Sequence, residues 1–190
     1  MKMALLLMPI LLAGSVALAD NSQPSCDAKC NFELEALKSH QSSPSLIYQD
    51  AMGSSSIAVQ LAALDYLSGR ANDFNVNSQA NGIAYLVAIA KQSSNSQIQI
   101  KAISLLKPLE SLMNMHNKID VVSGIRDIAL GSSDPNVAAT ALDALSSSFF
   151  NRSLERARTE AVNSIVDNQN RINSGGTVTN GQDSTGAGRN

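Results

Sequence analysis

The feature that most constrains this 190-residue chain is a pattern that recurs every 39 positions. In the clearest copy, Gly131 to Leu145 reads as a helix end, a short turn and a second helix start. Gly131 suits the left-handed residue that ends a helix, Asp134 suits an N-cap, and Pro135 suits the first helical position. The same step links Val59, Ile98 and Val137; Ala63, Ala102 and Ala141; Leu64, Ile103 and Leu142; and Leu67, Leu106 and Leu145. A fixed period of this length is typical of stacked helical units.

The turns and the helices before them follow the same step. The turns are Ser54-Ser55-Ser56, Ser93-Ser94-Asn95 and Ser132-Ser133-Asp134, and the last residue of each is a good N-cap type. The preceding helices repeat Ile47, Leu86 and Ile125, and also Ala51, Ala90 and Ala129. We therefore predict three repeats over residues 44–147.

This pattern resembles the HEAT repeats, in which an apolar helix, a short turn with Asp and Pro, and a second helix with Val, Ala and Leu follow one another. The resemblance implies an all-α fold, an α-solenoid of stacked antiparallel helix hairpins, and carries almost no information about function. The family often has Arg after the conserved Val, whereas this chain has Gln60, Gln99 and Ala138 there. Only the third turn holds the family's Asp, at Asp134. We therefore expect packing between repeats to rest mostly on apolar contacts.

Helices are also expected at both ends of the stack, because each end leaves an apolar face uncovered. Residues 20–43 are predicted to hold an N-terminal capping helix with the cysteine pair, and residues 148–170 a C-terminal capping helix. Residues 171–190 are rich in Gly, Ser, Thr and Asn and are predicted to be disordered. Residues 69–78 are predicted as a loop, with the next helix starting near Asn81. Residues 109–118 are predicted as a connector, with Asp120 as the following cap.

Residues 1–19 have the composition of a secretory signal peptide. Lys2 is the charged start, Ala4 to Leu12 is apolar, and Ala17 and Ala19 form a small-x-small cleavage site before Asp20. The apolar run is too short to span a hydrocarbon core of ~30 Å, and no second run is long enough. We expect a periplasmic or secreted protein without a transmembrane segment in the mature chain.

Cys26 and Cys30 are the only cysteines, and an even count in an exported protein suggests a disulfide. Residues four apart on a helix have Cβ atoms ~5–6 Å apart, whereas a disulfide needs ~3.5–4.5 Å. Cys26 therefore precedes the first helical turn, or the helix start is distorted, or the bond is absent. We favour the first case, because Pro24 and Ser25 suit a helix start. A bond to a second chain is the main alternative.

Charge and motifs argue against several functions. Without Lys2 the chain holds 13 basic and 16 acidic residues, and its aromatic residues are few, so nucleic acid is not an expected partner. Residues 104–107 fit S-x-x-K, but the partner motifs are missing. His40 and His116 are expected to be surface residues, and two thiols fall short of a four-ligand metal site. We expect no catalytic residues, no metal and no cofactor.

Three classes of function remain. We favour an exported scaffold that binds a protein or peptide partner. The alternative is a structural or assembly factor of a cell-envelope machine, such as one for secretion, conjugation or a surface appendage. An enzyme like the HEAT-like lyases that attach bilin pigments is less favoured, because export argues against it.

The resemblance implies that the second helix of each pair lines the concave face of the stack. Residues one period apart on these helices should line up across it. The candidate partner-binding residues are Gln60 and Gln99; Asp65, Ser104 and Asp143; and Tyr66 as an aromatic anchor. The alternative is that these side chains are merely solvated.

Overall fold

A computed structural model describes residues 26–71, 75–146 and 154–174, and in these ranges it holds helices and no strands. The predicted all-α class is confirmed for this part of the chain. The predicted signal peptide lies outside the described residues, as do residues 175–190 of the predicted tail. The helices are α1 (Ala28–Ser39), α2 (Pro44–Gly53), α3 (Ile57–Gly69), α4 (Val76–Gln92), α5 (Ser96–Leu106), the 3-10 helix η1 (Pro108–Leu112), α6 (Met115–Gly131), α7 (Pro135–Ser146) and α8 (Glu155–Asn173).

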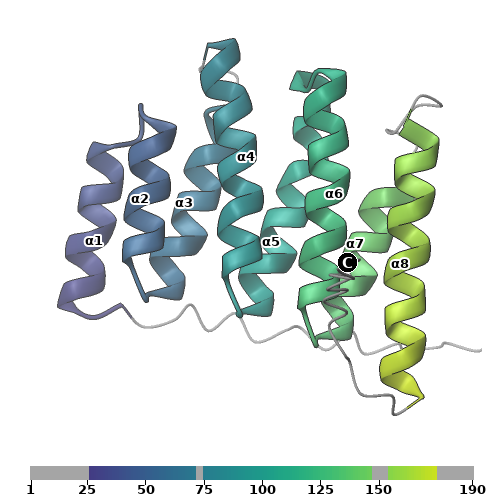
Figure 1. The fold of residues 1–190 in the computed structure, drawn as a ribbon. Coiled ribbons are helices and arrows are strands. Elements are labelled where there is room, and N and C mark those ends of the chain that lie inside the picture. The colour runs from purple at the N-terminus through teal and green to yellow at the C-terminus, as the bar shows by residue number, and fades with distance from the viewer. Residues whose placement is uncertain (1–25, 72–74, 147–153, 175–190) are drawn as a thin grey trace, which may run out of the picture.

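Most of the helices lie in two rows (Figure 1). One row holds α2, α4, α6 and α8, and the other holds α3, α5 and α7, with neighbours in each row in contact. Consecutive helices are antiparallel, so the helices of one row run in the opposite direction to those of the other row. At one end α1 packs against α2 and α3, and at the other α8 packs against α6 and α7.

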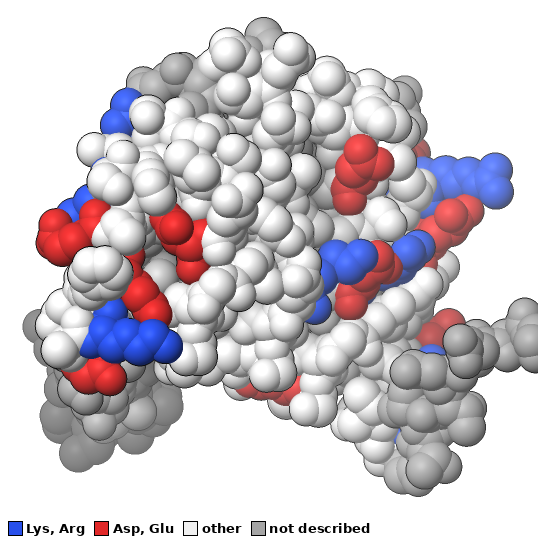
Figure 2. Space-filling view, turned by 60° about the vertical axis from the view of Figure 1, so that its left-hand side comes forward, with Lys and Arg blue, Asp and Glu red and all other residues white. Residues whose placement is uncertain are grey.

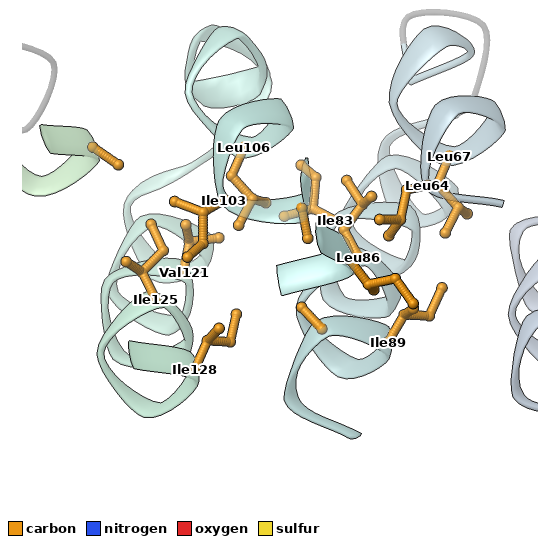
Figure 3. Packing of buried hydrophobic residues seen from close by; sticks show 14 of the residues in the cluster. Leu64, Leu67, Ile83, Leu86, Ile89, Ile103, Leu106, Val121, Ile125 and Ile128 are labelled. Atoms are coloured by element: carbon orange, nitrogen blue, oxygen red, sulfur yellow. The ribbon is translucent and has the colours of Figure 1, made fainter. Parts of the chain in front are cut away.

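The hydrophobic core lies between the two rows. Figure 3 shows Leu64 and Leu67 of α3 facing the side chains of α4, and Ile103 and Leu106 of α5 near those of α6. The repeated valine and alanine positions are fully buried: Val59, Ile98, Val137, Ala63, Ala102 and Ala141. Burying one Leu or Ile side chain contributes about 1.5–3 kcal/mol. The buried apolar residues of this core as a whole are therefore the main source of stability.

The three serine turns have nearly the same geometry. Ser54, Ser93 and Ser132 end their helices in extended backbone, with φ of −97°, −82° and −97° and ψ of 135°, 132° and 138°. Each serine hydroxyl accepts the N–H two residues on, at 3.0, 3.2 and 3.2 Å. Helices end and restart with a step of 39 residues on both sides of these turns. Gly131 is the last helical residue and not a left-handed cap, so that prediction is wrong.

Two helices start earlier than predicted, because an asparagine caps each of them. The Asn75 side chain accepts the N–H of Ser78 at 3.0 Å, so α4 begins at Val76 and Asn81 lies inside it. The Asn114 side chain accepts the N–H of Asn117 at 2.9 Å, so Asp120 is inside α6 and caps nothing. The last helix, α8, continues to Asn173, so the first residues of the predicted tail are helical.

Candidate functional site

Three of the predicted partner-binding residues form an exposed line across α3, α5 and α7. Asp65, Ser104 and Asp143 are all exposed. Lys101 Nζ lies 2.8 Å from Asp65 Oδ1, and Lys107 Nζ lies 3.5 Å from Asp143 Oδ2. We call these five residues the charged row. The lysines were not predicted, although each stands three residues from Ser104, a spacing that puts side chains on one helix face.

The salt bridges of the charged row are exposed and therefore weak. The Lys101 and Asp65 side chains are 40% and 57% exposed, and those of Lys107 and Asp143 are 42% and 75% exposed. Exposed pairs of this kind contribute about 0.2–1 kcal/mol each. The four charged groups can therefore exchange their present partners for those of another protein at small cost.

Gln60 and Gln99 do not form the second solvent-facing line that we expected. Gln99 is 4% exposed, and its Nε2 donates to the Ser93 carbonyl oxygen at 2.9 Å. Gln60 is half-buried and donates in the same way to the Ser54 carbonyl oxygen, also at 2.9 Å. Each side-chain amide therefore stabilises the turn that precedes its own helix. The prediction that Gln99 meets a partner is corrected, because its side chain is enclosed.

Tyr66 has an intermediate position. It is half-buried and packs against the core, so only part of its surface is open to a partner.

A second aromatic feature was not predicted. Tyr48 of α2 and Tyr85 of α4 stack with ring centroids 4.6 Å apart, and Gln92 Nε2 donates to the Tyr48 hydroxyl at 3.0 Å.

Both histidines have a carboxylate partner. His40 Nδ1 lies 2.7 Å from Asp50 Oδ2 and links the end of α1 to α2. His116 Nε2 lies 3.6 Å from Asp120 Oδ2, one turn along α6, and both side chains are largely exposed. Within the described ranges, no group of three or more His, Cys, Asp or Glu residues could hold a metal ion.

A group of three charged side chains links α4 to α6. Lys91 Nζ lies 2.8 Å from Asp127 Oδ2, and Arg126 Nη2 lies 2.8 Å from Asp127 Oδ1. Partial burial acts to raise the pKa of Asp127, but the hydrogen bonds from Lys91 and Arg126 outweigh it and hold that pKa below its usual value. Figure 2 shows charged side chains in separate groups with a broad uncharged area between them.

The cysteine pair sits at the start of α1. The two sulfur atoms are at disulfide distance, with the Cα atoms 5.3 Å apart. Cys26 precedes the helix, which begins at Ala28, in agreement with the case that we favoured. The Ser56 hydroxyl donates to Cys30 Sγ at 3.1 Å, and the Ser54 hydroxyl donates to Glu33. The pair is therefore attached to the first serine turn.

Several cavities lined by described residues reach the surface. One of about 300 Å³ lies between the first two serine turns and includes Gln60 in its lining, and one of about 680 Å³ lies between α6 and α8. A third, of about 150 Å³, lies between α4 and α6 and is mostly apolar.

No helix in the part of the chain that the structure describes is both long and apolar enough to cross a bilayer. Comparison of the chain with known protein families, with curated proteins and with solved structures finds no match.

Proposed function

We propose that this protein is an exported α-solenoid of three HEAT-like repeats that acts as a scaffold for a protein or peptide partner and catalyses no reaction. The observation that carries the proposal is the serine turn, whose backbone conformation and serine hydroxyl hydrogen bond recur at Ser54, Ser93 and Ser132. Helices joined by equal turns stack in equal steps and leave long surfaces on both sides, which suit extended partners.

A periplasmic or secreted location is part of this proposal. Its support is the composition of residues 1–19 and the cysteine pair at disulfide distance. Structural disulfides persist in oxidising compartments.

We place the partner on the charged row. Its residues come from three successive helices of one row, so a partner that crosses α3, α5 and α7 meets Asp65, Lys101, Lys107 and Asp143 in turn. Two lysines between two aspartates favour a partner with the complementary order of charges, because like charges placed opposite each other cost binding energy.

Site-specific photo-crosslinking in the cell tests this placement. A photoreactive residue at Ser104 should capture one partner, whereas the same residue at Thr159, exposed on α8, should capture none or a different one. The double variant Asp65→Asn and Asp143→Asn should reduce capture and lower the melting temperature by only a few degrees, because both ion pairs are exposed. Capture of several proteins of one assembly would favour the envelope-machine alternative. Equal capture at both positions would refute the charged row as the site.

A further inference from the structure

The cavity between α4 and α6 has an apolar lining and one acidic rim. Ile83 and Val121, each 3% exposed, are at its base, and Figure 3 shows both in the core. Ala80, Ala84 and Val87 of α4 complete the apolar lining, and Asn117 and Asp120 of α6 are its polar members. Ala84 and Asp120 are exposed, so the cavity opens to solvent.

The α4–α6 interface is packed differently from the α2–α4 interface one period earlier. Between α2 and α4, stacked rings fill the interface at Tyr48 and Tyr85. One period later the same two positions hold Val87 and Gly124. A Cβ atom at Gly124 would overlap Val87 Cγ1, so α4 and α6 approach each other closely at this point. Toward the helix starts, the small side chains Ala80 and Ala84 leave the cavity open.

The size and charge of the cavity define what fits it. A volume of about 150 Å³ is enough for one benzene-sized group. The Asp120 side chain at the rim is 66% exposed, and its Oδ2 lies 3.6 Å from Nε2 of His116, whose side chain is 84% exposed. Lys118 does not neutralise it, because Lys118 Nζ is paired with Glu110 Oε1 at 2.6 Å.

We propose that this α4–α6 cavity binds an aromatic side chain that stands next to an arginine or lysine in a peptide segment of a protein partner. The ring enters the apolar space beside Ala80 and Ala84, and the cation pairs with Asp120. The cavity lies between α4 and α6, whereas the charged row lies across α3, α5 and α7. Binding at the cavity can therefore be tested independently of binding at the charged row.

Titration of the ¹⁵N-labelled mature chain with short peptides tests the proposal. Acetyl-Phe-Arg-amide should shift the amide resonances of Ala84, Val87 and Asp120, whereas acetyl-Ser-Arg-amide should not. Asp120→Asn should weaken binding of the first peptide by up to about fivefold, the factor that corresponds to an exposed ion pair of about 1 kcal/mol. Acetyl-Phe-Glu-amide should bind more weakly than acetyl-Phe-Arg-amide to the unmodified chain.

Ala84→Leu should abolish binding by filling the cavity, and its exposed position makes the variant compatible with folding. The matched control is Ala88→Leu, one turn further along α4 and outside the lining. The variant Asp65→Asn with Asp143→Asn should bind the peptide normally. Undiminished binding to Ala84→Leu, equal shifts with the serine peptide, or no shift at the solubility limit would each overturn the proposal.

Discussion

The side-chain amide of Gln99 donates to the Ser93 carbonyl oxygen from a position that is almost closed to solvent. Its Oε1 atom has no hydrogen-bond partner among the described residues. Gln60 makes the same donor bond one period earlier from a half-buried position. The two residues therefore differ in burial and share one local role.

We expect Gln99→Ala to lower the free energy of unfolding by about 0.5–1.5 kcal/mol, because a buried turn loses its hydrogen bond. Gln60→Ala should cost less, since water can replace the amide there. Urea unfolding of both variants measures the difference. A larger loss for Gln60→Ala would contradict this assignment.

The close contact of Gly124 with Val87 gives a second prediction at this scale. Gly124→Ala should destabilise the protein by about 1–3 kcal/mol, because the added methyl group overlaps the stiff side chain of Val87. Adding Val87→Ala should recover part of this loss, and a double-mutant cycle of melting curves measures the coupling. Additive effects of the two changes would show that the helices separate freely.

Sequence reasoning located the exposed aspartates of the charged row but not the burial of Gln99. A period of 39 residues identifies which positions are equivalent, and helical spacing identifies which face they share. Neither reveals that a glutamine reaches back to a carbonyl oxygen six residues earlier. The cavity was also missed, because the 39-residue period does not reveal that the small side chains Ala80 and Ala84 leave a space between α4 and α6.

At the scale of elements, the helix starts show how a capping residue is mistaken for a loop former. Asn75 and Asn114 lie in segments that are predicted from the sequence as loop and connector, yet each side chain accepts a backbone N–H at a helix start. Asparagine favours both settings, so composition alone does not separate them. The three serine turns were located correctly because the same residues recur at each.

The third turn carries a pH-dependent cap. The backbone N–H of Asn136 donates to Asp134 at 2.8 Å and lowers the pKa of Asp134, and the Ser96 hydroxyl lowers it further. The folded pKa is therefore below the unfolded value of ~3.9, so the contribution is present above that pH and lost as the pH falls through the folded pKa.

We expect the stability difference between the unmodified chain and Asp134→Asn to change as the pH falls below about 4. Asparagine keeps the cap, as Asn95 does in the second turn, but cannot titrate. Thermal melts from neutral to acidic pH measure the difference. A difference that is constant with pH would exclude a coupling between Asp134 ionisation and folding.

At the scale of the whole molecule, the main helix contacts join elements that are close in sequence. Helices of one row touch their next neighbours, such as α2 with α4 and α4 with α6, and the rows touch through consecutive helices. Stability in such an arrangement is approximately a sum over units and their interfaces, so the ends open more readily than the middle.

Hydrogen exchange should therefore be slowest in α4, α5 and α6 and faster in α1 and α8. The double variant Cys26→Ser and Cys30→Ser should speed exchange in α1, which the pair anchors at the first turn, and leave α6 unchanged. Mass spectrometry of peptic fragments provides the measurement. Uniform exchange along the chain, or equal acceleration in α6, would indicate a single cooperative unit instead.

The equal geometry of the serine turns also bears on which segments could be deleted from the chain. Ser54 and Ser93 end their helices in the same backbone conformation, and the hydroxyl of each accepts the N–H two residues on. We therefore expect that residues 55–93 can be deleted as one segment, because the deletion would join α2 to α5 through a turn of the same geometry. The shortened chain would keep α1 and α8 at its two ends. It would lose the Tyr48–Tyr85 stack and the α4–α6 cavity together, because both depend on α4.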